Sequence, residues 1–91
     1  MLRITRRASG EVVFKLSGRF ETQNIAELEA LLSGETGGPS IILDLSDITL
    51  VDQDVVNFLG RSETDGIKLK NCPAYVREWI KREKGRDSSS G

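Results

Sequence analysis

The chain has 91 residues, of which 37% are hydrophobic and 30% charged, a composition typical of one small soluble domain. Its formal net charge of −1 offers no basic excess to hold a phosphate backbone, so nucleic acid is not an expected partner. The sequence contains no histidine and one cysteine, which excludes histidine-based catalysis, histidine-based metal sites, a zinc knuckle and an internal disulfide. We therefore expect a cytoplasmic, non-enzymatic domain without membrane insertion, metal or cofactor.

The N-terminal segment predicts a β-hairpin. Apolar residues alternate with polar ones over residues 2–5, a turn follows at residues 8–10, and residues 12–16 form the second strand. Gly18 is expected to end this strand. The basic residues between positions 3 and 7 are expected to be exposed, where their charge discourages pairing at a sheet edge.

An amphipathic helix is predicted next. Asn24 and Glu27 have the spacing of an N-cap and its reciprocal acid, and Thr22 is an alternative cap. The apolar positions that share one face are Ile25, Leu28, Leu31 and Leu32. The helix should end at residues 33–34. The glycine-rich segment 34–38 lacks the ending of a phosphate-binding loop and precedes a strand, so we interpret it as a connection.

The central segment combines a strand with the start of a helix. The apolar run over residues 41–45 is typical of a strand buried on both faces. Asp52 is suited to cap the helix that follows, and residues 46–51 are predicted to form the loop between them. The apolar face of this helix contains Val55, Val56, Phe58 and Leu59. A loop that leads into a helix N-terminus, with its unpaired N–H groups, is a favourable place for a binding surface.

The C-terminal part predicts a short strand over residues 67–69 and a last helix. Asp65-Gly66 closes the preceding helix, and Pro73 suits the first turn of the last one. Its apolar face contains Val76, Trp79 and Ile80. Gly85 is expected to end the helix, which leaves one domain over residues 1–85 and a flexible polar tail over residues 86–91.

Cys72 has two interpretations. It or Asn71 could cap the last helix, where the thiol pKa can be lowered and the sulfur made nucleophilic. No base accompanies it in the sequence, so we interpret Cys72 as a packed, unreactive thiol.

The predicted order is β-β-α-β-α-β-α. Strands that alternate with helices indicate an α/β fold with a mixed four-stranded sheet, parallel apart from the first hairpin, and helices packed on it.

This order and several short motifs resemble the STAS domain, the fold of anti-sigma-factor antagonists and of the cytosolic tails of sulfate transporters. The similar segments are Leu16-Ser17-Gly18-Arg19-Phe20, Asn24 with Leu28, Ile42-Leu43-Asp44-Leu45-Ser46, Leu50-Val51-Asp52, Gly66-Ile67-Lys68-Leu69 and Cys72-Pro73-Ala74-Tyr75-Val76. The resemblance extends over residues 2–84. It implies a short version of the fold, because the family continues with a further strand and helix.

The resemblance also implies a non-catalytic protein–protein interaction module that regulates bacterial transcription. In anti-sigma-factor antagonists the segment after the central strand is close to Asp-Ser-Ser-Gly, and its second hydroxyl residue is phosphorylated by a serine kinase that is also the anti-sigma factor. This chain has Asp52-Gln53-Asp54-Val55 there, so Asp54 takes the phosphoacceptor position and ordinary kinase switching cannot occur. Either Asp54 fixes one state, or the site binds through a different chemistry. A carboxylate in the first turn also stabilises the helix through its dipole, and the two roles can coexist.

The expected partner-binding residues lie in segment 46–54 and on the exposed side of the next helix. They are Ser46, Asp47, Thr49, Asp52, Gln53, Asp54, Asn57 and Arg61, with Glu63 at the rim. The partner is expected to be an anti-sigma factor of the serine-kinase type. The alternative is a transporter or scaffold subunit, as in a lipid-transport ATPase or a stress-signalling complex.

Further alternatives are weaker. A small-ligand or nucleotide sensor would bind an anion at the helix start, where Asp52 and Asp54 would repel it. A receiver-type phosphoaspartate at Asp44 is rejected, since the accompanying acidic pair and lysine are not evident. Pairing of two copies into a homodimer through a hairpin edge is also considered.

Overall fold

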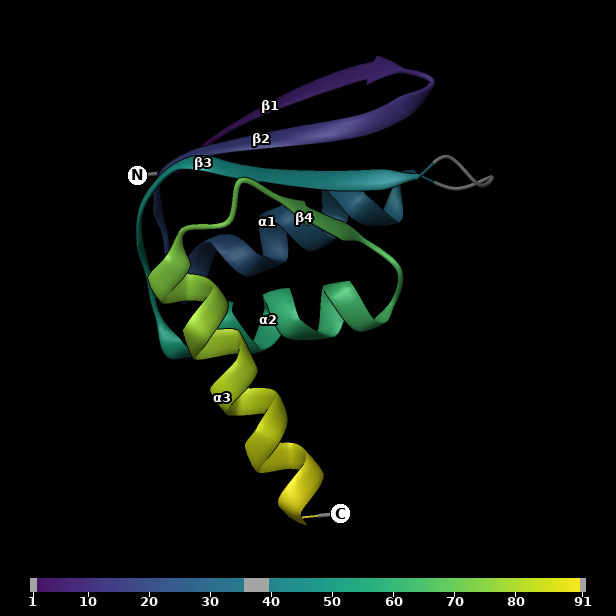
Figure 1. Cartoon of the computed structure of the whole chain (residues 1–91). Helices are drawn as coiled ribbons and strands as arrows, with labels where there is room; N and C mark the ends of the chain where they lie inside the picture. Colours follow the sequence, from purple (N-terminus) through teal and green to yellow (C-terminus); the bar gives the residue numbers. More distant parts are fainter. Residues whose placement is uncertain (1, 36–39, 91) are drawn as a thin grey trace.

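The computed structural model describes residues 2–35 and 40–90, with the backbone alone for Ser9 and residues 85–90. The elements follow in the predicted order: β1 (Leu2–Ser9), β2 (Glu11–Phe20), α1 (Thr22–Ser33), β3 (Ile41–Val51), α2 (Gln53–Thr64), β4 (Lys68–Lys70) and α3 (Ala74–Ser90). The strands form one sheet in the order β1-β2-β3-β4 (Figure 1). β1 pairs antiparallel with β2, and the other neighbours are parallel. The predicted α/β class, element order and mixed sheet are confirmed.

All three helices lie on one side of the sheet (Figure 1). The strands β2, β3 and β4 are neighbours in chain order, and right-handed crossovers that advance in one direction place their helices on one face. The expectation that residues 41–45 are buried on both faces is therefore wrong. Leu43 and Leu45 are buried under the helices, whereas Ile42 and Asp44 are only half-buried on the other face.

The core lies between the sheet and the helices. Phe14 and Leu16 alternate with exposed or half-buried residues along β2, and Phe20 packs edge-on against Phe58 of α2 with ring centroids 6.1 Å apart. Fully burying each such side chain contributes about 1.5–3 kcal/mol relative to leaving it in water. The other fully or almost fully buried large side chains are Leu28, Leu43, Leu45, Val55, Val56, Leu59, Val76 and Ile80.

The second and third strands are longer than predicted. β2 continues past Gly18 to Phe20, and Gly18 has a φ of 96° beside a register shift against β3. A glycine with positive φ permits such an irregularity without ending the strand. The predicted loop over residues 46–51 is part of β3, because parallel pairing with β2 continues to the pair Phe20↔Val51.

The helix starts also differ from the predictions in detail. The N-cap of α1 is Glu21, so Asn24 is the third residue of the helix and not its cap. The two residues form a capping box, in which Asn24 Oδ1 accepts a hydrogen bond from Glu21 N at 3.0 Å. Leu31 lies at the edge of the apolar stripe and is 40% exposed. In α3 the Pro73 carbonyl accepts from Arg77 N at 3.0 Å, so neither Asn71 nor Cys72 is the cap.

α3 continues through Gly85 to Ser90, so the predicted end at Gly85 is wrong and the expected flexible tail is helical in its described part. A glycine inside a helix costs only about 1 kcal/mol, which good helix formers before it can offset. The strand expected at residues 67–69 is shifted by one residue to Lys68–Lys70. Residues 36–39 of the glycine-rich connection, and Gly91 of the tail, lie outside the described residues.

Candidate functional site

Asp52 caps α2 as predicted, and it also caps α1. Its Oδ1 accepts from Val55 N at 3.0 Å, which satisfies one of the unpaired donors at the start of α2. Its Oδ2 accepts from the backbone N of Thr22 at 2.7 Å and from the Thr22 hydroxyl at 2.8 Å. One carboxylate therefore joins the first turns of two helices that follow neighbouring parallel strands.

The pKa of Asp52 reflects this network. Partial desolvation raises the pKa, but the hydrogen bonds from Thr22 and Val55 favour the charged form and together hold the pKa below its ordinary value. Both carboxylate oxygens are engaged inside the chain. Asp52 is therefore a structural anchor of the site.

Thr22 was considered in the sequence only as a cap for its own helix. In the structure its hydroxyl lies 2.8 Å from Asp52 Oδ2 and 3.2 Å from Asp54 Oδ2, so it links the two acids. The signal that could have located it is topological: helices that leave adjacent parallel strands begin at the same edge of the sheet.

Asp54 lies exposed in the first turn of α2, where a negative charge is favoured by the helix dipole. Apart from Thr22, its carboxylate is open to solvent. Gln53 is exposed beside it, with its Nε2 3.5 Å from Asn57 Oδ1 one turn later.

A groove of about 710 Å³ runs over α2 between α1 and α3. Asp54, Asn57 and Arg61 lie along it on α2. The buried residues Val56, Gly60 and Ile80 contribute to its floor. The remaining lining residues are Thr22, Ile25, Ala26 and Glu29 of α1, Thr64 of α2, and Glu83 and Lys84 of α3.

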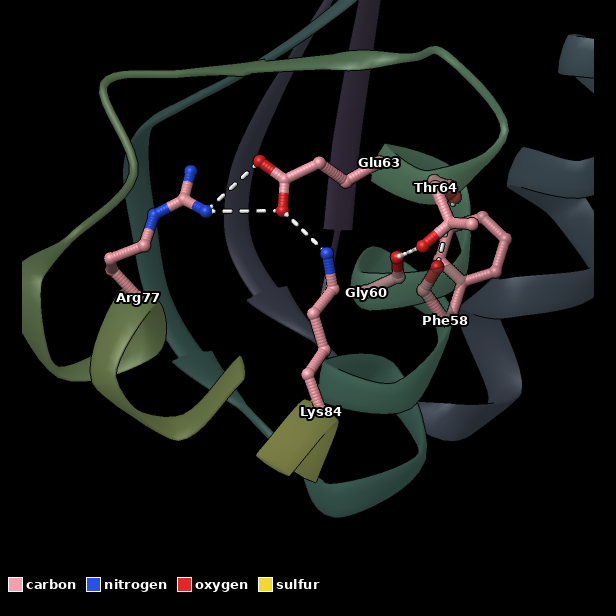
Figure 2. A network of polar contacts seen from close by, with 7 residues as sticks. Phe58, Gly60, Glu63, Thr64, Arg77 and Lys84 are labelled. Carbon is pink, nitrogen blue, oxygen red and sulfur yellow. Dashed lines mark hydrogen bonds and ion pairs between the residues drawn. The ribbon is translucent and has the colours of Figure 1, made fainter. Parts of the chain in front are cut away.

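Glu63 of α2 connects α3 to α2 along the groove through ion pairs with two basic residues of α3. Arg77 Nη1 donates to both Glu63 oxygens, at 3.1 and 2.9 Å, and Lys84 Nζ donates to Oε1 at 3.1 Å (Figure 2). Desolvation raises the pKa of Glu63, but these two cations outweigh it and the pKa is lowered. Glu63 was expected at the rim of a partner interface; instead it ties α3 to α2.

The remaining predicted contact residues lie on β3, outside the groove. Ser46, Asp47 and Thr49 are exposed strand residues. Asp47 projects from the sheet face that carries no helix, where its Oδ2 is 3.3 Å from Lys15 Nζ. The structure therefore divides the predicted set: Asp54, Asn57 and Arg61 line the groove, Asp52 supports it, Gln53 lies beside its end, and the β3 residues are elsewhere.

Asp44 has a structural role. Its Oδ1 accepts from Ser46 N at 3.0 Å and from Asn71 Nδ2 at 3.3 Å, which links β3 to the segment after β4. Desolvation raises its pKa, but the hydrogen bonds from Ser46 and Asn71 and the charge of Lys15 lower it overall. Asn71 has a φ of 56°, a left-handed conformation that asparagine tolerates better than most residues.

Cys72 is half-buried and packed against the core. Burial raises the pKa of its thiol, and the nearby Arg77 only partly opposes this. A raised pKa disfavours the thiolate, in agreement with a packed, unreactive thiol.

No family model matches the chain, and no curated protein matches it significantly. Among solved structures it is similar to an uncharacterised protein of the DUF3478 family from Shewanella loihica PV-4, described as having a SpoIIAA-like fold, with 18% sequence identity and a TM-score of 0.43. The similarity covers 75% of this chain and 61% of that chain, so this chain spans less than two thirds of its length.

No helix in the described residues is long and apolar enough to span a membrane.

Proposed function

We propose that this protein is a non-catalytic interaction module, similar to an anti-sigma-factor antagonist, and that it binds a protein partner in the groove over α2. The observation that carries the proposal is the arrangement of Asp54, Asn57 and Arg61. Asp54 was singled out for its position in the STAS-like motif, and Asn57 and Arg61 for the exposed side of the helix that follows it. All three line one groove with a partly apolar floor.

The shape and charge of the groove favour a peptide segment over a small anion. It is flanked by two helices and floored by a third, which suits a helix or extended segment that buries apolar side chains. Its charges are mixed along its length: Asp54 and Glu29 contribute acids, and Arg61 contributes a base. The two carboxylates at the start of α2 repel an anionic ligand there.

Asp54 makes the proposed interaction constitutive. A phosphorylated serine would bring a charge of about −1.5 to −2 that kinase and phosphatase could add and remove. The carboxylate of Asp54 is permanent, and its short arm carries fewer acceptor oxygens than a phosphate. The partner is therefore regulated by the amount of this protein rather than by its modification at this position.

The test is capture of partners from the native cytosol by the tagged protein, with bound proteins identified by mass spectrometry. The Asn57→Arg/Arg61→Glu variant changes the groove, and Lys81→Glu on the exposed side of α3 is the control. We expect a protein that binds the unchanged chain and the control but is lost from the groove variant.

The identity of that protein distinguishes the two candidate circuits. An anti-sigma factor of the kinase class supports partner switching. A transport ATPase or stress-complex subunit supports the alternative regulatory role. Equal capture by all three chains would exclude the groove as the interface.

A further inference from the structure

The sheet has a second face that none of the described helices covers (Figure 1). Along β2 the buried Val12, Phe14 and Leu16 point to the helices, so Val13 and Lys15 point to the opposite side. We call the surface formed by residues with this second orientation the open sheet face. It lies across the sheet from the α2 groove.

The strand register places the residues of the open sheet face in rows. One row runs Arg7, Val13, Ile42 and Lys68 from β1 to β4, and the next row contains Lys15, Asp44 and Lys70. Arg3 lies on β1 opposite Ser17 and belongs to the same face. Both edges of the face are therefore basic, while its centre contains the half-buried Val13 and Ile42.

At the centre of the face the base Lys15 lies near two acids, whereas the cations at the edges have no such partners. Lys15 Nζ is 3.3 Å from Asp47 Oδ2, and the Lys15 charge also lowers the pKa of Asp44. None of the edge cations, which are Arg3, Arg7, Lys68 and Lys70, forms an ion pair with any residue that the structure describes. The row through Val13 and Ile42 has an apolar centre between charged rims, which is the usual anatomy of a protein interface.

We propose that the open sheet face binds an acidic amphipathic helix of a protein partner. Three strand spacings separate β1 from β4, a width of about 14 Å. A helix with its side chains is about 10–12 Å across. The partner helix therefore fits between the basic edges, with its apolar side over Val13 and Ile42. Glutamates on one flank of the helix would face Arg7, and glutamates on the other flank would face Lys68.

The composition of the face favours a protein over other anionic partners. Single-stranded nucleic acid is held by aromatic rings that stack on bases, but the described phenylalanines of the sheet, Phe14 and Phe20, point into the core. The acids Asp44 and Asp47 lie in the middle of the face, where they repel a uniformly negative polymer or lipid surface. A helix with acids only on its flanks avoids them.

The test uses a synthetic peptide of about 18 residues, roughly 27 Å long when helical, with a leucine and alanine seam flanked on both sides by glutamate. The isotopically labelled full chain is titrated with it and followed by NMR. We expect saturating shifts in the amides of β1 to β4 that leave the α2 groove unchanged. The Arg7→Glu/Lys68→Glu variant should weaken binding by about tenfold or more, since charge repulsion replaces attraction at both rims.

A matched variant, Lys81→Glu/Arg82→Glu, makes the same change in net charge on the exposed side of α3. Binding within about twofold of the unchanged chain is expected for it, as electrostatic attraction here is local and screened over about 10 Å. Because all four positions are exposed, dispersion of the amide spectrum shows whether each variant remains folded.

Other outcomes overturn the proposal. Equal weakening in both variants would indicate attraction to net charge alone. Shifts confined to the groove would place the peptide at the other site. Tighter binding of oligouridine, or of phosphatidylserine vesicles, through the same amides would assign the face to nucleic acid or to membrane. Failure of the capture experiment on the α2 groove leaves this test unaffected, because the two surfaces lie on opposite sides of the sheet.

Discussion

Two aspartates separated by a single residue, Asp52 and Asp54, have different roles at the start of α2. Asp52 accepts hydrogen bonds from the first turns of both helices, whereas the exposed carboxylate of Asp54 accepts a hydrogen bond from the Thr22 hydroxyl. Residue 54 can therefore be changed without breaking the hydrogen bonds of Asp52 that join α1 and α2. The difference leads to two predictions at the scale of single residues.

Asp52→Ala should destabilise the protein by about 1–2 kcal/mol, because it removes an N-cap and leaves donors of Thr22 and Val55 without their partner. Asp54→Ala should cost less, about 0.3–1 kcal/mol, the size of an exposed charge–dipole interaction. Urea unfolding of the two variants and the unchanged chain measures both. Equal losses would contradict the division of roles.

The lowered pKa of Asp52 predicts an acid-sensitive link between α1 and α2. A carboxyl whose folded pKa lies below its unfolded value of about 3.9 adds stability above that pH, and this stability is lost as the pH falls through the folded pKa. Asp52→Asn should therefore flatten the fall of unfolding free energy below about pH 4. Chemical denaturation from pH 7 to pH 2.5 tests this, with Asp54→Asn as the control, and a slope unchanged by Asp52→Asn would refute the linkage.

At the scale of elements, the sequence was a good guide where the signal was local. The spacing around Asp52, the alternation in β2 and the apolar faces of α2 and α3 located the elements and the cap. The strand ends were misplaced, because the pairing that extends β3 to Val51 depends on β2, which is distant in the sequence. The ion pair of Glu63 with Arg77 was not predictable for the same reason, and the link through Thr22 could be expected only once the order of the strands was known.

The packing of α3 on α2 leaves room at Gly60. A Cβ there would lie 3.7 Å from Ile80 Cγ2 and 3.7 Å from Lys84 Cε, which is ordinary van der Waals contact. Gly60→Ala should therefore stabilise the protein by about 0.5–1 kcal/mol, through reduced entropy of the unfolded chain.

The matched control for Gly60 is Gly10→Ala in the hairpin turn. Gly10 has a φ of 88°, so alanine there should be destabilising by about 1–2 kcal/mol although no neighbour obstructs it. Thermal or urea unfolding measures both changes. A loss of stability on Gly60→Ala would show that the two helices are closer than the structure indicates.

At the scale of the whole molecule, the one-sided arrangement of helices produces two surfaces of different character. The groove over α2 is built from helix side chains of both charge signs, and the open sheet face has basic edges and a half-buried apolar centre. The sheet and its core separate them. If both proposed surfaces bind, two partners could be bound at once without either one blocking the other.

This separation predicts independent binding at the two surfaces. Asp54→Arg should change capture of the groove partner, yet leave the affinity of the glutamate-flanked peptide for the open sheet face within about twofold. Arg7→Glu/Lys68→Glu should weaken binding of the peptide and leave capture of the groove partner unchanged. The substituted residues on each surface are distant from the other surface, and the exposed charges are screened over about 10 Å. Isothermal titration of the peptide into both variants, in parallel with capture of the groove partner, provides the comparison. If a change on one surface altered binding on the other by about tenfold, the sheet would transmit a conformational change, and the two surfaces would form one coupled site.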